Sequence, residues 1–461
     1  MSENKLSGLF AYDGHISVDE VAPLGLQHVV AAVAGIVTPG IMVAKICNLN
    51  AANTTIIIQT SLIFAGLATL IQLFPIFRRF GARLPMMMGA SFACVPILLM
   101  IGGDFGIADI FGAQLVGSII ITFLGLILKK IRILFPPIVT GTVILSIGLS
   151  LFPTAVNYIA GGAGNPNFGS AKNWAVALIT FAVVFYFNYF AKGFLSLSSI
   201  LNGMVIGYLV ALMLGMVDFS PVHSAAFFQV IKPFHFGLSF KIVPIITLTI
   251  VFLVDTVQTI GQFTATTVGS MDRQPSDHEL SGAIMGKGLI NIIGSLFGGL
   301  PVGTFGQNVG LVIATRAINK FILTFSCGIL LVAGFVPKFA SILTTIPYAV
   351  IGGATISVFA TIAMTGIKTI TSVKMTKENS AVVGISLAFG IGVALSQNSL
   401  AGFPEWVNTI FGSSEVILTT ILAIVLNLLL NHVKKPQEIK AKKAVKVKTT
   451  VEKAQLEHKY Q

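Results

Sequence analysis

One apolar stretch of this chain is interrupted by LPVGTFGQNVG, which occupies residues 300–310. Proline removes a backbone donor and glycine permits unusual backbone directions, so we expect the helix to break here. An earlier stretch, LPMMMG at residues 84–89, has the same Leu-Pro start and ends on a corresponding glycine. The two stretches are 216 to 217 residues apart, which indicates a repeat with one broken apolar segment in each half.

A second pair of stretches supports this repeat. FPPIVTG at residues 135–141 resembles IPYAVIG at residues 346–352, with Pro, Val and Gly coinciding at an offset of 211 residues. The third apolar segment thus matches the tenth, and the fifth matches the twelfth. Because a shift of seven segments is odd, the two halves must cross a membrane with opposite topology. Inverted repeats with paired broken helices are typical of secondary transporters, whose binding site lies between the breaks.

The composition excludes a large soluble protein. Of 461 residues, 54% are hydrophobic and only 10% are charged, whereas a soluble domain has about 25% charged residues. Runs of about 20 apolar residues span the hydrocarbon layer as helices. We therefore predict an all-α polytopic membrane protein with about 14 transmembrane segments, near residues 23–43, 53–75, 84–101, 109–128, 134–152, 173–191, 197–216, 243–262, 283–300, 303–314, 320–336, 343–362, 380–396 and 414–432.

Lys and Arg are distributed unevenly between the predicted loops. If the N-terminus is cytoplasmic, 13 of them lie in inside loops and 5 in outside loops, the terminal segments excluded. An even number of segments returns the C-terminus to the same side. We expect a cytoplasmic segment at residues 1–22, a transmembrane domain at 23–432 and a basic cytoplasmic tail at 433–461 of a cell-membrane protein. Nine lysines without interleaved aromatic residues favour a solvated, disordered tail over nucleic-acid binding, and contact of this tail with anionic lipid is the alternative.

Two adjacent carboxamides follow the second break. Gln307 and Asn308 stand between Gly306 and Gly310, at a depth where an unpaired amide costs several kcal/mol. Each amide offers two donors and an acceptor, so it can pair with the alternating C=O and N–H groups of a nucleobase edge. The glycines would let the backbone approach such a ligand, and the following helix would point N–H groups at it. In the alternative interpretation the amides only cap the broken helix.

The sequence offers little support for catalysis. Cys47, Cys94 and Cys327 lie far apart and form no metal-binding spacing, and His278-Glu279 lacks the second histidine of a metalloprotease helix. The sequence contains no Walker-type phosphate loop. We therefore expect no enzymatic activity, no cofactor and no metal, and transport that is gradient-driven or facilitated.

The stretch QNVGLVIATR at residues 307–316 resembles the signature of the nucleobase–ascorbate transporter family, also called nucleobase:cation symporter-2. That signature has Gln or Glu, then Asn, any residue, Gly, four residues, Thr, and commonly Arg, Lys or Gly. The similarity extends over most of the chain, from GLQH at residues 25–28 to the Ile-Pro and Gly-Gly pairs within residues 346–353.

The resemblance implies a fold with two domains. It implies seven-plus-seven inverted repeats in which spans 3 and 10 are broken. A core domain would comprise about residues 23–128 and 243–336, and a gate domain about residues 134–216 and 343–432. Short extended pieces of spans 3 and 10 would hold the base between them.

The resemblance also implies a set of site residues. These are Gln307, Asn308 and Gly306 at the signature, Phe92 in span 3 and His28 in span 1, with Gly310, Thr315 and Arg316 completing the signature. A buried His28 that bonds only to a neighbouring helix is the alternative for that residue. In the family, Gln at the first signature position accompanies xanthine and urate, and Glu accompanies uracil, so the resemblance favours a purine.

Several positions depart from the family pattern. Gln258 stands where relatives usually have Glu, Gln262 where many have an acid, and Lys287 where purine carriers often have Asp. Asp255 lies on the same helix face as Gln258 and is the only acidic residue that we place deep in a span. We hypothesise that Asp255 is the coupling carboxylate, paired with Lys287, and that Gln258 binds the base as a neutral amide. Alternatively, the pair only locks two helices together.

These features predict a secondary active transporter for a purine nucleobase, xanthine or urate, moved by alternating access with a proton or with Na⁺. Uracil is the next candidate cargo, followed by guanine or hypoxanthine. From another class, a sulfate or bicarbonate anion exchanger of the same fold would lack the Gln-Asn signature. Members of the resembled family are often dimers, so a homodimer is a further expectation.

Overall fold

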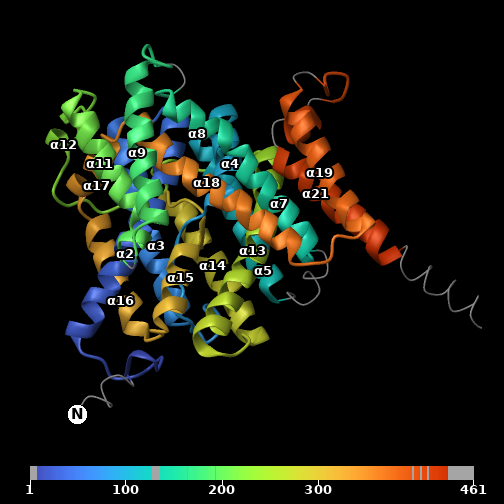
Figure 1. The fold of residues 1–461 in the computed structure, drawn as a ribbon, viewed down its shortest axis with the longest axis horizontal. Helices are drawn as coiled ribbons and strands as arrows, with labels where there is room; N and C mark the ends of the chain where they lie inside the picture. Colours follow the sequence, from blue (N-terminus) through green and yellow to red (C-terminus); the bar gives the residue numbers. More distant parts are fainter. Residues whose placement is uncertain are drawn as a thin grey trace, which may run out of the picture.

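The protein is seen here in a computed structural model, which describes residues 8–126, 135–162, 165–192, 194–396, 399–404, 407–412 and 415–433. It is mostly helical (Figure 1). Within these ranges, nine helices are long and apolar enough to cross a membrane, or ten if one helix pair bent by 80° counts as a span. The chain is therefore a multi-pass membrane protein of the predicted class. The lysines of the tail and of the predicted loop near residue 130 lie outside the described residues.

The helices follow the predicted segments in order. The first half contains α2 (Val18–Ile46), α3 (Ala51–Leu73), η1 (Phe92–Cys94), α4 (Val95–Asp104), α5 (Ile107–Leu126), α7 (Pro137–Ser150), α8 (Phe152–Ile159), α9 (Ala171–Tyr189), α10 (Phe194–Leu197), α11 (Ser199–Met213) and α12 (Ser220–Ser224). The second half contains α13 (Ile242–Met271), α14 (Asp277–Phe297), α15 (Gly306–Thr315), α16 (Lys320–Gly334), α17 (Pro337–Thr344), α18 (Tyr348–Thr371), α19 (Lys377–Leu395), η3 (Asn408–Gly412), α21 (Glu415–Asn427) and η4 (Leu428–Val433). Two short strands complete the set, β1 (Met88–Ala90) and β2 (Val302–Thr304).

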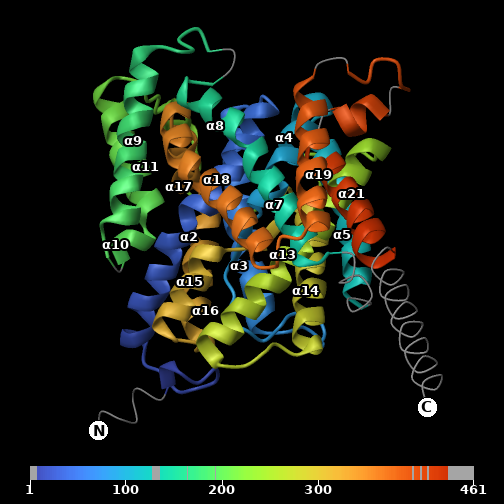
Figure 2. The ribbon, with the colours of Figure 1, turned by 45° about the vertical axis from the view of Figure 1, so that its right-hand side comes forward.

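The helices pack in two groups that each combine the two halves of the chain. In one group, α14 packs on α5, and α16 packs on both α2 and α3. In the other, α18 packs on α7, α8 and α9, and α19 packs on α21 (Figure 2). Pairing of first-half with second-half helices within each group is what two interleaved repeats produce.

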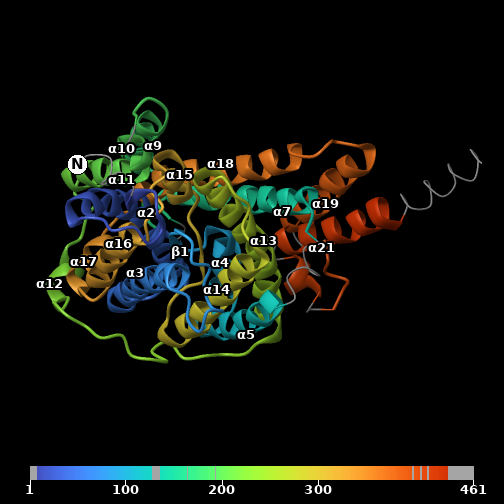
Figure 3. The ribbon, with the colours of Figure 1, turned by 90° about the horizontal axis from the view of Figure 1, so that it is seen from below.

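The two broken segments meet in the middle of the first group. β1 pairs with β2 in antiparallel register, with Met88 opposite Thr304 and Ala90 opposite Val302. In the view from below, β1 lies among α2, α3 and α4 (Figure 3). A backbone that leaves the helix at membrane depth needs partners, because lipid offers none.

Side chains from the neighbouring helices supply those partners. The hydroxyl of Thr69 accepts a hydrogen bond from the Met88 N–H at 2.9 Å, and the amide oxygen of Asn291 accepts one from the Val302 N–H at 2.8 Å. The amide of Gln114 donates to the Gly299 carbonyl at 2.9 Å. These polar residues are buried in apolar helices, and their positions explain how both breaks are tolerated.

Several helix ends differ from the predicted ones because caps, and not the apolar run, set them. α2 begins at Val18, inside the predicted N-terminal segment, because Ser17 and Glu20 form a capping box. α13 continues to Met271, well past residue 262, and ends where Asp272 adopts a left-handed conformation with φ of 51°. α18 starts at Tyr348 and not at residue 343, because Ile346-Pro347 cannot continue the preceding helix α17.

Candidate functional site

The first turn of α15 lies against α13 and leaves open space in front of both helices. α13 and α15 are in contact, and a Cβ added at Gly306 would lie 3.6 Å from Nε2 of Gln262. Gly261 and Gly310 are exposed, and a Cβ added at either would meet no described atom within 4 Å. The glycines therefore leave room for a ligand to approach the backbone of α15 and the face of α13.

Two glutamine amides on these helices are not used by the protein. Among the described residues, the side chains of Gln258 on α13 and Gln307 on α15 have no hydrogen-bond partner, and both are half-buried. Oε1 of Gln262, one turn after Gln258, is buried and unpartnered within the same described set. Since unpaired amides are costly away from water, this arrangement is what a site for a polar ligand requires.

Asn308 has a different environment from its neighbour. It is buried, and its Nδ2 donates to Nδ1 of His28 at 2.9 Å and to the backbone oxygen of His28 at 3.0 Å. His28 is buried in the middle of α2. The two residues thus join the first turn of α15 to α2, and His28 makes a contact between the two helices.

Phe92 lies where the two helix groups meet. It begins η1, separated from the end of β1 by one residue, is half-buried, and its ring packs edge-on against Phe359 of α18, with ring centroids 6.3 Å apart. On the other side, a Cβ added at Gly35 of α2 would lie 3.6 Å from the Phe92 ring. The ring therefore stands between α2 and a helix of the other group.

A buried ion pair connects three elements next to the breaks. Asp255 of α13 and Lys287 of α14 pair directly, and each residue is only 3% exposed. Lys287 also donates to the hydroxyl of Thr259 at 3.0 Å. The other carboxylate oxygen of Asp255 accepts from the Ser91 hydroxyl at 3.2 Å, and the Ser91 N–H donates to the Pro301 carbonyl at 2.8 Å. The pair is thus linked to both broken segments through Ser91.

The end of the signature lies away from these amides. The Thr315 hydroxyl donates to the Leu311 carbonyl at 2.8 Å within α15. Arg316 ends the helix in a left-handed conformation with φ of 53° and pairs with exposed Asp272 at 3.2 Å. Thr315 and Arg316 therefore terminate α15, and in the described residues they make no contact with the open space.

Some site residues were not singled out from the sequence. Ser91, Thr69, Asn291 and Gln114 each bond to a broken segment or to the ion pair. The available signal was a set of polar side chains inside otherwise apolar runs next to each break. Across the described residues, no group of three His, Cys, Asp or Glu side chains is placed to hold a metal ion.

Comparison with known proteins identifies the family. Residues 19–399 match the family model Xan_ur_permease, whose description is "Permease family". The chain belongs to this permease family. It is therefore a transporter and not an enzyme, and the sequence resemblance is confirmed.

Relatives of this permease cover nearly its whole length. The xanthine permease of Bacillus subtilis strain 168 is 33% identical over 419 residues, which are 90% of this chain and 95% of the relative. The uric acid transporter UacT of Escherichia coli K12 is 33% identical over 447 residues, 95% of this chain and 92% of the relative.

Solved structures share the fold of the permease. The transmembrane domain of the cyanobacterium bicarbonate transporter BicA matches with a TM-score of 0.58, covering 88% of this chain and 97% of that domain. At 15% identity this likeness concerns the fold alone. The fold is the predicted seven-plus-seven inverted repeat.

Proposed function

We propose that this permease carries a purine nucleobase, xanthine or urate, across the cell membrane by alternating access. The observation that carries the proposal is the pair of uncommitted amides, Gln258 of α13 and Gln307 of α15, on two helices that contact each other. The relatives named for xanthine and uric acid support the cargo, and the much lower identity to a bicarbonate transporter does not favour an anion exchanger.

The chemistry of the site suits a flat heterocycle with alternating C=O and N–H groups. Gln307 can donate and accept along one edge of the base, and Gln258 can do the same along another. Backbone N–H groups in the first turn of α15 favour an oxo group or the negative charge of urate. Phe92 offers a ring face for stacking.

In this proposal His28 positions the site by holding Asn308, whose buried Oδ1 has no partner among the described residues and remains for the base. Their bonds are already made between α15 and α2, which leaves neither Nδ2 of Asn308 nor Nδ1 of His28 for a ligand. Gly306 is exposed, and a Cβ there would make only an ordinary contact with Gln262, so its proposed role is to leave the backbone of α15 open to the base. Gly310, Thr315 and Arg316 shape and end the half-helix.

The two helix groups would act as core and gate. The core would contain α2 to α5 and α13 to α16, and the gate α7 to α11 and α18 to α21. The base would lie at their boundary, where Phe92 of the core meets Phe359 of the gate. Relative movement of the two groups would break this contact and expose the base to one side at a time.

Asp255 is the proposed coupling carboxylate, with a proton as the coupled ion and Na⁺ as the alternative. Its carboxylate bonds to Lys287 and to Ser91, which directly precedes Phe92. A change in the charge of Asp255 would therefore alter the hydrogen bond that holds the segment next to Phe92. A buried pair that serves only to lock α13 to α14 is the competing role.

Uptake of radiolabelled xanthine, urate, uracil and guanine in cells that lack purine permeases tests the function. We expect accumulation of xanthine or urate that an uncoupler abolishes and that unlabelled sulfate or bicarbonate does not inhibit. Uptake of sulfate that xanthine fails to inhibit would contradict the proposal. Uptake of uracil alone would show that uracil, and not a purine, is the cargo.

A further inference from the structure

Residues 8–14 fold back over the end of the protein where α2 begins. They precede α2 and contact two connections, the one that follows α3 and the one between α15 and α16. These connections lead into the first broken segment and out of the second. The sequence predicted only a cytoplasmic segment here, so the contacts call for an explanation of their own.

A single buried amide organises the segment. Nδ2 of Asn319 lies 2.9, 3.2 and 2.8 Å from the carbonyl oxygens of Gly8, Ala11 and Gly14, so the segment wraps around it. Asn319 also caps α16, because its Oδ1 accepts from the Phe321 N–H at 3.0 Å. Only 1% of Asn319 is exposed. The residue therefore joins the segment to the start of α16.

Backbone bonds strengthen this junction. The Leu9 carbonyl accepts from the N–H groups of Ile318 and Asn319 at 3.1 and 3.3 Å. The Tyr12 carbonyl accepts from the Lys320 N–H at 3.1 Å. The second half of the connection that leaves α15 is thus held by this segment.

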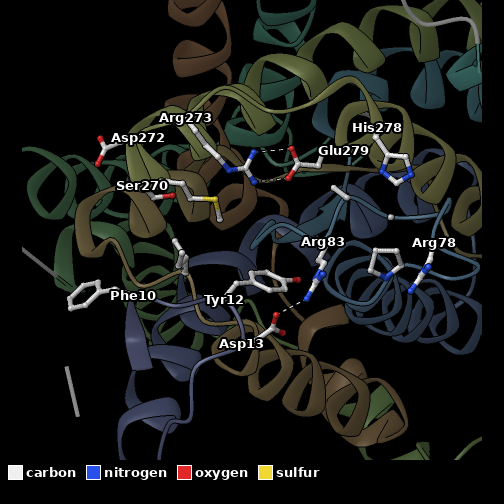
Figure 4. Close-up of a pocket in the computed structure, with 15 residues that line it drawn as sticks. Phe10, Tyr12, Asp13, Arg78, Arg83, Ser270, Asp272, Arg273, His278 and Glu279 are labelled. Carbon is white, nitrogen blue, oxygen red and sulfur yellow. Dashed lines mark hydrogen bonds and ion pairs between the residues drawn. The ribbon is translucent and has the colours of Figure 1, made fainter. Parts of the chain in front are cut away.

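Asp13 and Tyr12 reach the other connection. One oxygen of Asp13 accepts from Lys320 and the other from Arg83, both at 2.6 Å. The Tyr12 hydroxyl donates to the Leu73 carbonyl at the end of α3, at 2.6 Å. Figure 4 shows Tyr12 and Asp13 beside Arg83, at a cavity of about 880 Å³ that the end of α13 and the start of α14 also line.

We propose that residues 8–14 form an intramolecular clasp that fixes the two broken segments relative to each other, and that Asp13 and Asn319 are positioning residues for the base. Arg83 shortly precedes β1, and Ile318 shortly follows α15, so the clasp joins the outer ends of the elements that flank the open space. α15 has ten residues, too few to hold its place without tertiary contacts. At its other end, the link to α2 through His28 is the matching anchor.

Two independent readouts on the full-length purified protein test the clasp. The first is the equilibrium dissociation constant for xanthine, and the second is hydrogen exchange in peptides that cover residues 302–320. Exchange does not depend on the cargo, so a wild-type protein that binds no purine would refute the proposed function while the clasp could still be tested. The variants are Asp13→Asn, Asn319→Ala and, as a matched control, Asp19→Asn, whose carboxylate is exposed in α2 outside the clasp.

For Asn319→Ala we expect at least a tenfold weaker binding of xanthine, because three carbonyls lose a buried donor and the first turn of α16 loses the acceptor that caps it. Its exchange across α15 should rise above that of wild type. For Asp13→Asn we expect a roughly threefold weakening, because two partly exposed ion pairs contribute little each. The conservative variant Asp13→Glu should restore part of the affinity, and Asp19→Asn should match wild type.

A merely structural segment would give another result. If Asn319→Ala is monodisperse and shows wild-type affinity and wild-type exchange in α15, the clasp is refuted. If Asn319→Ala fails to fold, Asp13→Asn provides the test. Wild-type xanthine affinity and wild-type hydrogen exchange in Asp13→Asn at low salt would then refute the proposal. High salt should weaken the binding of xanthine to wild type until its affinity is close to that of Asp13→Asn. The affinity of Asp13→Asn itself should change little with salt.

Discussion

Nδ2 of Asn308 lies 2.9 Å from Nδ1 of His28 and 3.0 Å from the backbone oxygen of the same residue. An amide nitrogen only donates, so the imidazole Nδ1 accepts, and the ring is neutral with its proton on Nε2. The neighbouring amide of Gln307 has no partner among the residues described. Of the two adjacent carboxamides, Asn308 therefore uses its Nδ2 inside the protein, while its Oδ1 and the whole amide of Gln307 have no partner in the described part of the chain.

The first prediction concerns the Asn308–His28 contact. Asn308→Ala and His28→Ala should each raise KM for xanthine by about tenfold, because a lost buried hydrogen bond costs about 1–3 kcal/mol. The double variant should be scarcely worse than either single variant, since both remove the same contact. Initial rates of uptake at equal membrane abundance measure this. Additive effects would show that the two residues act separately on the base.

The second prediction separates coupling from structure at the ion pair. Asp255→Asn should abolish accumulation, because it leaves the Lys287 charge buried without its partner. The double variant Asp255→Asn/Lys287→Gln removes both charges. We expect it to equilibrate xanthine across the membrane without accumulating it and without response to an uncoupler.

An accumulating double variant would contradict the coupling role of Asp255. In that case the pair would only join α13 to α14, as in the competing interpretation. The measurement is the steady-state ratio of inside to outside xanthine, with and without uncoupler, for wild type and both variants.

The third prediction divides the roles of two aromatic rings. Phe92→Ala should raise KM about tenfold or more, since stacking of a base on an aromatic ring contributes about 1–3 kcal/mol. Phe359→Leu should change the maximal rate and leave the affinity close to wild type, because Phe359 lies on the other helix group. Saturation curves of uptake distinguish the two effects. A large loss of affinity in Phe359→Leu would place that ring in the binding site.

The fourth prediction concerns pH at the N-terminal clasp. The hydrogen bond from Lys320, followed by Arg83, lowers the pKa of Asp13 below its usual range, while the rim also carries His278 and the Arg273–Glu279 pair. A lowered pKa means that stabilisation is present above the unfolded value of about 3.9 and is lost as pH falls through the folded value.

The melting temperatures of wild type and Asp13→Asn, compared across pH, check this sign. The difference between them should stay constant from pH 8 to about pH 5 and shrink only at lower pH. A difference that disappears between pH 7 and pH 6 would contradict the assignment of this stabilisation to the Asp13 carboxylate.

The sequence predicted the fold well because the repeat is marked by proline and glycine, whose backbone effects are local. It did not predict the pairing of Met88 with Thr304, because strand register depends on contacts between distant residues. The different burial of Gln307 and Asn308 depends on helix phase, since successive side chains point about 100° apart. The clasp was missed because its carbonyl groups are common to every sequence, and only the fold brings them to Asn319.

The free amide of Gln307 is the central element of the proposed site, and one measurement tests it most directly. The dissociation constant of xanthine is compared between wild type, Gln307→Ala and Gln274→Ala, an exposed glutamine in the loop after α13. The account predicts at least tenfold weaker binding for Gln307→Ala and no change for Gln274→Ala. Wild-type affinity in a correctly folded Gln307→Ala protein would contradict it.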